Sequence, residues 1–281
     1  MKLVTCLHEG KERVGALMDG VVVFLPYPDM NTLIETASVA ELQTVPAECG
    51  VPLEDVTLLA PIPRPRQDVI CLGMNYTDHA EESARFNAGA FTKEEAVAVY
   101  FSKRVNEATA PEAPVESHQG LVDSLDYEVE LAVIIGKAAR DVKAEDAKDY
   151  VFGYTVLNDV SARNLQTRHL QWYFGKSLDG FTPMGPCILT ADETAFPPAL
   201  EVSSRINGEL RQHSNTERLI TSIPAIIAEL SRGMTLLPGT IIATGTPAGV
   251  GLGFNPPQYM KPGDIMECTI EKIGTLRNPI V

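Results

Sequence analysis

The stretch Asp126-Tyr-Glu-Val-Glu-Leu-Ala-Val-Ile-Ile135 combines two acidic residues with a long apolar run, which predicts a strand over residues 128–135. Alternate side chains of a strand share a face, so Glu128 and Glu130 would point the same way. Glutamate is depleted in strands and like charges repel, so this pair is unfavourable unless a positive charge compensates it. A divalent cation would supply that charge. A solvated strand face is an equally acceptable interpretation of the pair taken alone.

A second apolar strand, Val151–Leu157, ends abruptly in Asn158-Asp159 ahead of a stretch that we expect to be helical, Ser161–Trp172. Asp159 at this strand end is either the cap of the following helix or a third carboxylate ligand beside the two glutamates. Three carboxylates completed by water suit a hard cation such as Mg²⁺ or Mn²⁺. The absence of a His or Cys ligand cluster in the sequence argues against zinc.

Strands alternate with a few short helices along the rest of the chain, without a repeating period, which predicts an α+β fold dominated by sheet. Residues 1–64 are interpreted as a small β-rich N-terminal domain, with hairpin chemistry at Asp19-Gly20. The proline-rich run Ala60–Arg66 forms a stiff connector, so residues 65–281 are the main domain. A core-packing helix is expected from Ser222, as its cap, to Gly233.

Composition excludes several classes of protein. The chain has 281 residues, of which 44% are hydrophobic and 21% charged, as in ordinary globular proteins. Its net charge of −14 disfavours nucleic acid and lipid headgroups as partners. Five scattered cysteines without a C-x-x-C pair, and no signal-peptide pattern, favour the cytoplasm. The longest uncharged stretch, 233–259, is broken by glycine and proline, so we expect no membrane span.

Two glycine-containing segments resemble nucleotide-binding loops but lack a required residue. Phe174-Gly-Lys-Ser177 has Leu170 where a phosphate loop needs its first glycine. Gly249-Val-Gly-Leu-Gly-Phe254 has phenylalanine where a dinucleotide loop needs its last glycine. We therefore expect neither ATP nor a nicotinamide cofactor. Between the strand end and the first of these segments, Arg163 and Gln166 are three residues apart and share a helix face that could meet a bound anion.

One histidine is paired with a carboxylate by its spacing. His79 and Glu82 lie three residues apart on a polar helix, Asp78–Arg85, that has almost no apolar stripe. The carboxylate can orient the imidazole and raise its basicity, as in an acid/base group. The remaining histidines lack such a partner, and we interpret them as structural or solvent-facing: His8, His118, His169 and His213.

Five short motifs, in order over about residues 66–281, resemble the fumarylacetoacetate hydrolase superfamily, in its branch of acylpyruvases, oxaloacetate decarboxylases and hydroxyheptadienedioate isomerases. They are Leu72-Gly-Met-Asn-Tyr-Thr-Asp-His79, Asp126-Tyr-Glu-Val-Glu-Leu131, Asn158-Asp-Val-Ser-Ala-Arg163, Gly175-Lys-Ser177 and Thr244-Gly-Thr-Pro-Ala-Gly-Val-Gly251. The resemblance implies a mixed β-sheet roll or sandwich of the fumarylacetoacetase C-terminal type, with a small β-rich N-terminal domain. It also implies a homodimer.

The resemblance implies a site for Mg²⁺ or Mn²⁺ under a lid that carries the acid/base pair. Its metal ligands would be Glu128, Glu130 and Asp159, in agreement with the reading of the residues themselves. Its catalytic residues would be His79, Glu82, Gln166 and Lys176, and its substrate-binding residues Thr246, Arg163 and Lys103.

The implied reaction is hydrolytic cleavage of a carbon–carbon bond in a 2,4-dioxo acid such as fumarylpyruvate or acetylpyruvate. His79 would take a proton from water, and the metal with Lys176 would stabilise the pyruvate enolate that leaves. Oxaloacetate decarboxylation and 2-hydroxyhepta-2,4-diene-1,7-dioate isomerisation in aromatic acid catabolism use a similar enolate and are the alternatives. Residues in Phe86–Tyr100, lining the distal part of the pocket, would discriminate among them.

A different class of protein is a non-enzymatic binding protein in which the ion only holds strands together. Such a protein would explain the three carboxylates. It would not require Lys176, Gln166 or the pair of His79 and Glu82. The sequence therefore favours a metal-dependent enzyme acting on a small 2-oxo acid.

Overall fold

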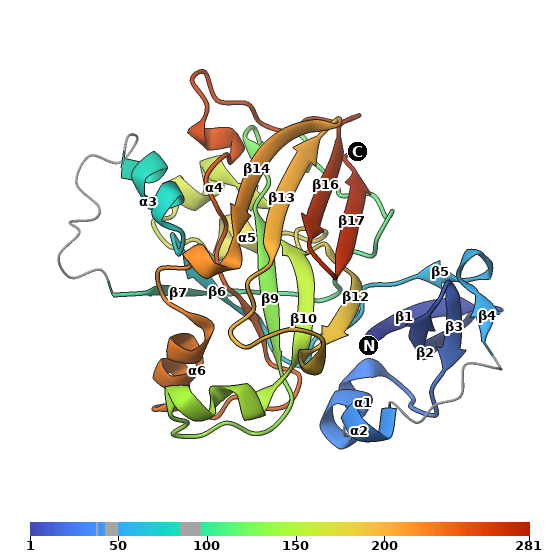
Figure 1. The fold of residues 1–281 in the computed structure, drawn as a ribbon. Helices are drawn as coiled ribbons and strands as arrows, with labels where there is room; N and C mark the ends of the chain where they lie inside the picture. The colour runs from blue at the N-terminus through green and yellow to red at the C-terminus, as the bar shows by residue number, and fades with distance from the viewer. Residues whose placement is uncertain (38, 43–49, 85–96) are drawn as a thin grey trace.

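The computed structural model describes residues 1–37, 39–42, 50–84 and 97–281 (Figure 1). Its main sheet has the strand order β4-β3-β2-β1-β12-β10-β9-β15-β6-β7, with β5 paired to β1. These strands are β1 (Lys2–His8), β2 (Lys11–Met18), β3 (Val21–Phe24), β4 (Val51–Pro52), β5 (Thr57–Leu58), β6 (Val69–Gly73), β7 (Val99–Lys103), β9 (Val129–Ile135), β10 (Val151–Asn158), β12 (Met184–Thr190) and β15 (Ile241–Ala243).

Two smaller sheets complete the described strands. One has the order β14 (Glu209–Asn215), β13 (Glu201–Ile206), β16 (Ile265–Ile270), β17 (Gly274–Pro279), and the other pairs β8 (Leu125–Asp126) with β11 (Ser161–Ala162). The α-helices are α1 (Met30–Thr36), α2 (Val39–Leu42), α3 (Thr77–Ala84), α4 (Arg163–Arg168), α5 (Tyr173–Lys176) and α6 (Ile223–Ser231). The 3₁₀ helices cover Leu53–Asp55, Ala144–Tyr150, Ala191–Glu193, Thr216–Arg218 and Gly251–Gly253.

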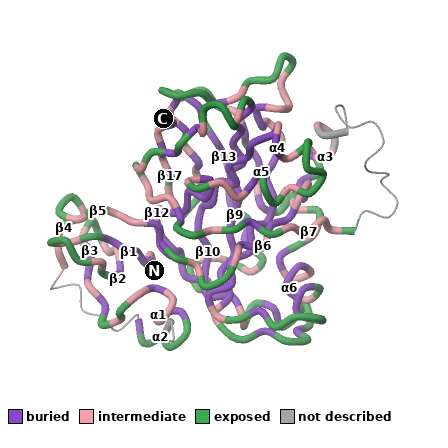
Figure 2. The backbone as a smooth tube through the Cα atoms, turned by 180° about the vertical axis from the view of Figure 1, so that it is seen from behind, coloured by how far each residue is buried: buried purple, intermediate pink, exposed green. Residues whose placement is uncertain are grey.

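Strands β9 and β10 form the centre of the molecule and are buried along their whole length (Figure 2). Their near-continuous apolar sequences fit this position, because β13 and β16 pack over them from the second sheet. Strand β15 pairs parallel to β6 and antiparallel to β9, so the main sheet is mixed. The prediction of a sheet-dominated α+β fold is confirmed.

The N-terminal strands include the expected hairpin. Asp19 and Gly20 join β2 to β3 with φ values of 47° and 82°, the left-handed conformation that a two-residue hairpin turn requires. Strand β1 pairs with β12, with Leu3 opposite Ile188, so hydrogen bonds of the main sheet cross the expected boundary near residue 64. Figure 1 shows β1–β5 beside the larger body of the molecule. The division into two domains stays a prediction.

The expected helix over Ser161–Trp172 is wrong in its extent. Ser161 and Ala162 form β11, helix α4 ends at Arg168, and α5 begins only at Tyr173. Leu170 has a φ of 60°, and a right-handed helix cannot continue through a left-handed residue. The break folds α5 back onto α4, so that a Cβ on Gly175 would overlap the backbone of Gln166.

Helix α6 follows the expected cap residue, Ser222, and buries its apolar face. It ends at Ser231 with Arg232 as its C-cap, so Gly233 stands at the expected C′ position, although it does not take the positive φ of a left-handed cap glycine. In the part of the chain that the structure describes, every helix is too short or too polar to span a membrane.

Candidate metal and 2-oxo acid site

Three carboxylates meet where β9 begins and β10 ends. The strands are antiparallel, with Asn158 opposite Val129, and this register brings Glu128, Glu130 and Asp159 together. One carboxylate oxygen of each lies within 4.8 Å of the others. The exposed fractions are 6%, 1% and 0%, so a solvated strand face is excluded. Asp159 is not the cap of the helix after it, because the N-cap position of α4 is Ala162.

Lysine and arginine side chains compensate two of the three carboxylates. Lys176 Nζ lies 2.8 Å from Glu128 Oε2 and 2.7 Å from Asp159 Oδ2, and Arg163 Nη1 lies 2.7 Å from Glu128 Oε1. Burial alone would raise the pKa of Glu128, but Lys176 and Arg163 lower it to about 2. Burial opposes the charge of Lys176, yet Asp159 and Glu128 raise its pKa to about 12. Both groups are therefore charged at neutral pH.

Glu130 has no cation partner among the described residues. Its Oε2 accepts a hydrogen bond of 2.7 Å from the backbone N–H of Gly245, while its Oε1 is buried without any partner. Burial, followed by the charges of Asp159 and Glu128, raises the pKa of Glu130 well above its usual range. A buried carboxylate oxygen with no donor is expensive unless a cation binds it. The three carboxylates thus fit a hard divalent ion.

The buried ion-pair cluster around the candidate metal ligands, counted without Glu82 and His79, has one negative charge in excess when all its groups are ionised. Asp126 adds a fourth buried carboxylate, 2.8 Å from Arg163 Nε. Four carboxylates face three cations, Arg163, Lys103 and Lys176. A divalent ion would reverse the sign of this cluster, so that the loaded cluster would attract an anionic ligand.

Arg163 and Gln166 share one face of α4, as their spacing predicts. Arg163 Nη1 donates a hydrogen bond of 3.0 Å to Gln166 Oε1. The Arg163 guanidinium is wedged between Asp126 and Glu128, and its Nη2 is buried without a partner. Burial opposes its charge, but the two carboxylates raise its pKa further. Arg163 thus supports Glu128 as well as lining the cavity.

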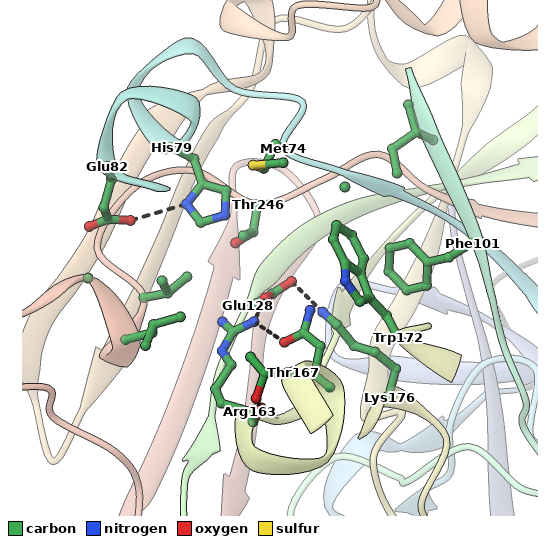
Figure 3. Close-up of a pocket in the computed structure, with 16 residues that line it drawn as sticks. Met74, His79, Glu82, Phe101, Glu128, Arg163, Thr167, Trp172, Lys176 and Thr246 are labelled. Atoms are coloured by element: carbon green, nitrogen blue, oxygen red, sulfur yellow. Dashed lines mark hydrogen bonds and ion pairs between the residues drawn. The ribbon is translucent and has the colours of Figure 1, made fainter. Parts of the chain in front are cut away.

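His79 and Glu82 face Glu128 from the other side of the cavity (Figure 3). His79 Nδ1 lies 3.1 Å from Glu82 Oε2, which is the pairing that the sequence predicted. Helix α3 carries both, and although that helix is polar, His79 is only 8% exposed. With the Glu82 carboxylate on Nδ1, Nε2 is the ring nitrogen left for a ligand.

A cavity of about 130 Å³ lies between these two groups. Apolar side chains form much of its wall, and six further predicted residues line it beside His79. The lining is Leu72, Gly73, Met74, His79, Glu82, Phe101, Glu128, Arg163, Gln166, Thr167, Trp172, Lys176, Thr246, Val250, Leu252 and Gly253.

Three predicted residues lie behind this lining. Glu130 and Asp159 are deeper than Glu128. Lys103 does not line the cavity as a substrate contact would. Its Nζ lies 2.8 Å from Asp159 Oδ1 and also donates to the carbonyls of Val160 and Lys176, so it supports a carboxylate instead. Burial lowers the pKa of Lys103, because one carboxylate and two carbonyls compensate it less than two carboxylates compensate Lys176.

Thr246 lines the cavity, but its hydroxyl is already engaged. Thr246 Oγ1 donates to the carbonyl of Val129 at 2.9 Å and accepts from Gln212 Nε2 at 2.7 Å. The segment Phe86–Tyr100, expected to line the distal part, falls mostly outside the described residues. Its described part, residues 97–100, does not line the cavity.

The sequence reasoning missed the aromatic wall and the role of Asp126. Trp172 packs edge-on against Phe101, with ring centroids 5.2 Å apart, and a Cβ on Gly73 would overlap its ring. Trp172 is the single tryptophan of the chain, a signal that could have drawn attention to it. Asp126 opens the motif that holds both glutamates, yet it was given no role.

Comparison with known proteins agrees with this geometry. Residues 68–281 match the family model "Fumarylacetoacetate (FAA) hydrolase C-terminal". Oxaloacetate tautomerase YisK of Bacillus subtilis (strain 168) is 47% identical over 228 residues, which cover 81% of this chain and 74% of that protein.

Solved structures give the same result over the whole chain. A fumarylacetoacetate hydrolase from psychrophilic Exiguobacterium antarcticum is 41% identical with a TM-score of 0.87, covering 100% of this chain and 99% of that one. The 2-hydroxyhepta-2,4-diene-1,7-dioate isomerase from Mycobacterium marinum is 33% identical with a TM-score of 0.77, covering 100% of this chain and 98% of that one. The match extends through the strands and loops that carry the buried carboxylates and the cavity. The chain therefore belongs to the fumarylacetoacetate hydrolase family.

Proposed function

We propose that this chain is an enzyme that interconverts the keto and enol forms of a small 2-oxo dicarboxylic acid such as oxaloacetate, using Mg²⁺ or Mn²⁺. The observation that carries the proposal is the small cavity between Glu128 and His79, with the uncompensated carboxylate of Glu130 directly behind it. A relative that is 47% identical and named an oxaloacetate tautomerase supports it. Hydrolysis of a carbon–carbon bond, the reaction that the sequence resemblance implied, has weaker support.

Glu128, Glu130 and Asp159 would hold the ion, which would supply Lewis-acid stabilisation of negative charge on the substrate oxygens. The chain's own cations add to this. Lys176 Nζ is fixed beside Glu128 at 2.8 Å and needs no reorganisation to meet an oxygen of the substrate. The free donor of Gln166, on the same wall, can orient a carboxylate.

His79 is the residue placed to move the proton. Interconversion requires that one proton leave or join the carbon next to the keto group while another joins or leaves the oxygen. The neutral imidazole can accept a proton at Nε2, because Glu82 holds the Nδ1 side at 3.1 Å and stabilises the cation that forms. The apolar side chains around the cavity limit access of water to the substrate.

The size of the cavity supports a small substrate. Its volume of about 130 Å³ is well below the roughly 300–1,000 Å³ that is usual for drug-sized ligands. Trp172 and Phe101 close the apolar side. A short acid with two carboxylates meets these dimensions better than a long dienoic acid.

Hydrolysis of an acylpyruvate is the second candidate. The pairing of His79 and Glu82 that could move a proton on carbon could also activate water, and one similar structure is named a fumarylacetoacetate hydrolase. Decarboxylation of oxaloacetate is the third. All three reactions develop negative charge at the same end of the substrate, so the site residues by themselves do not distinguish between them.

A direct assay separates the three reactions. Purified protein with Mg²⁺ or Mn²⁺ is mixed with enol-oxaloacetate, and the ultraviolet absorbance of the enol is followed. Interconversion predicts rapid loss of the enol without production of pyruvate. Pyruvate from oxaloacetate would support decarboxylation, and pyruvate from acetylpyruvate or fumarylpyruvate would support hydrolysis. Failure to accelerate the enol reaction would contradict the proposal.

Metal removal is expected to destabilise the protein as well as inactivate it. A divalent ion neutralises the buried charge of Glu130, so binding favours the folded state. At a hundred times the dissociation constant, one bound ion should stabilise the fold by about 2.7 kcal/mol. Thermal unfolding with EDTA, Mg²⁺ and Mn²⁺ measures this, with K⁺ at matched ionic strength as the control. An unfolding temperature unaffected by both divalent ions would count against the site.

Truncating Trp172 should relax selection against longer substrates. The Trp172→Ala variant opens the apolar wall beside Gly73. We expect kcat/KM for a longer 2-oxo acid, relative to oxaloacetate, to rise by about tenfold, a typical effect of changed apolar contact. Tyr173→Ala is the matched control, because Tyr173 is adjacent, 43% exposed and absent from the lining. An equal change in both variants would refute the role of the wall.

Assembly and location are also part of the proposal. We propose a cytoplasmic homodimer with a small 2-oxo acid as its ligand and with no nucleic acid or membrane partner. Light scattering of the purified protein measures the molar mass, and a monomeric mass at micromolar concentration would contradict the dimer.

A further inference from the structure

The carboxylate of Asp126 joins two parts of the site that are far apart in the sequence. Asp126 is fully buried, and its Oδ2 accepts hydrogen bonds from Arg163 Nε at 2.8 Å and from the backbone N–H of Leu252 at 2.9 Å. Its Oδ1 accepts the backbone N–H of Gly251 at 2.6 Å. Because Arg163 also pairs with Glu128, Asp126 connects a candidate metal ligand to residues 249–253, here called the glycine loop.

The other side of the glycine loop receives Glu82. The backbone N–H of Gly249 donates to Glu82 Oε1 at 3.1 Å. A Cβ on Gly253 would overlap the carboxylate of Glu82, so the glycine there allows the carboxylate to approach the backbone. Glu82 in turn holds His79 Nδ1.

We infer that Asp126 is a positioning residue that couples Glu128 to His79 through the glycine loop. The inference rests on the proposed function, in which His79 and the metal carboxylates act on one substrate from opposite sides. Hydrogen bonds link Glu128, Arg163, Asp126, the loop and Glu82, and their geometry sets where the imidazole stands relative to Glu128. None of the atoms of Asp126 lines the cavity, so it acts only through its partners.

The physical reason is that no sheet holds the glycine loop, whose one regular element is the short 3₁₀ helix Gly251–Gly253. The N–H groups of Gly251 and Leu252 point inward and need a buried acceptor, which Asp126 provides. A charged acceptor makes strong and directional bonds. A displacement of about 1 Å at a catalytic group can cost about a hundredfold in rate. Precise placement of Glu82 therefore has a measurable effect on turnover.

The first test is Gly253→Ala. The backbone of Gly253 needs no positive φ, and the atoms that a methyl group would meet are the movable end of Glu82, so the variant should fold normally. We expect kcat to fall by about tenfold or more, with the Mn²⁺ dissociation constant within about twofold of wild type. Gly233→Ala is the matched control, because nothing lies within 4 Å of the added Cβ. Wild-type kcat in Gly253→Ala would overturn the inference.

A double-mutant cycle distinguishes coupling through Glu82 from a general structural effect. In a Glu82→Gln background the contact is already impaired, so Gly253→Ala should cost less than about twofold further. Asp126→Asn presents an amide NH₂, which cannot accept a hydrogen bond, to Arg163 or Leu252 in place of an oxygen. The loss of kcat caused by Asp126→Asn should likewise be smaller in the Glu82→Gln background than in the wild type. Losses that simply multiply would overturn the inference.

The buried Asp264→Asn serves as the matched control for Asp126→Asn. Asp264 also accepts a backbone N–H, that of Lys261 at 2.9 Å, but it lies away from the cavity. Asp126→Asn should in addition weaken Mn²⁺ binding several-fold, because Arg163 then supports Glu128 less well. A variant that fails to fold is replaced in this comparison by Gly253→Ala.

A readout that needs no substrate separates this inference from the proposed function. The Nδ1 proton of His79, bonded to Glu82, should give a downfield proton resonance that is absent in His79→Asn. Gly253→Ala and Asp126→Asn should shift or abolish it, while Gly233→Ala and Asp264→Asn should leave it in place. If the wild type turns over no 2-oxo acid but this pattern holds, only the proposed function fails. If the resonance is unmoved in both Gly253→Ala and Asp126→Asn, the coupling itself is refuted.

Discussion

Glu130→Gln is expected to remove metal binding and to lower kcat/KM by about a thousandfold, while the protein stays folded. Glu130 is the one candidate ligand without a cation partner in the described structure, so its charge has no structural task that glutamine would leave undone. The glutamine keeps the shape and can still accept the N–H of Gly245. Loss of Lewis-acid stabilisation and of charge at such a site typically costs several kcal/mol in the transition state.

In the absence of metal, Glu130→Gln should be at least as stable as the wild type, although it loses activity. The pKa of Glu130 is raised because ionising it in this buried, negative environment is unfavourable. That cost accumulates as the pH rises above the usual pKa of a glutamate, so it weakens the metal-free fold at neutral pH, and Glu130→Gln should unfold at the same or a higher temperature than wild type in EDTA. Addition of Mn²⁺ should then raise the unfolding temperature of wild type only.

Calorimetric titration with Mn²⁺, thermal unfolding and turnover together check this prediction. The control is Glu271→Gln, a change at an exposed glutamate after β16, which should alter none of the three. A variant that keeps wild-type Mn²⁺ affinity would show that the carboxylates do not form the metal site. A variant that unfolds even with metal would favour an ion with a purely structural role.

Lys176→Met is expected to have the second largest effect, with opposite consequences for stability and for metal binding. Lys176 compensates Glu128 and Asp159 in the metal-free protein, at 2.8 and 2.7 Å. Removing one partner of a buried ion pair typically costs about 3–5 kcal/mol, so the metal-free variant should be clearly less stable. Arg163 and Lys103 remain as the cation partners of these carboxylates among the described residues.

Metal binding should survive or tighten in Lys176→Met, because Lys176 no longer competes for the carboxylate oxygens. Turnover should still fall by about a hundredfold to a thousandfold, the usual cost of losing one donor to developing charge. Substrate affinity should change less than turnover. Lys261→Met, at an exposed lysine, is the control. Equal stability of variant and wild type in EDTA would contradict the ion pairs, and unchanged turnover would contradict the catalytic role.

Much of the site could be predicted because, within one strand or helix, the spacing of two residues in the sequence determines whether their side chains lie on the same face. Glu128 and Glu130 share a face since side chains alternate along a strand, and His79 and Glu82 meet because they are three apart on a helix. Local rules also predicted the hairpin at Asp19-Gly20. They failed at Leu170, where a left-handed residue ends α4 although the composition of 161–172 suits a helix. The packing of α5 against α4 overrides helix propensity there.

The partners of the charged groups could not be predicted, because ion pairs form between segments whose separation in the chain carries no signal. Lys103 was expected to contact substrate and instead supports Asp159 from behind, 56 residues away. Arg163 reaches Asp126 at a separation of 37 residues, and the glycine loop reaches the same carboxylate from 125 residues away. A sequence ranks such residues by type, but only the fold fixes which carboxylate each one meets.

By itself, the sequence determined that the chain forms a sheet-dominated α+β protein with a net charge of −14, with acidic side chains at two strand ends and a histidine beside a glutamate. These features follow from local periodicity and from the low tolerance of apolar strands for charge. Only the tertiary structure decided that Glu130 lacks a cation, that Lys176 spans Glu128 and Asp159, and that Asp126 ties the glycine loop to the carboxylates. Those contacts depend on the register of β9 against β10 and on where loops that are distant in the sequence pack against the site. Long-range packing determines both.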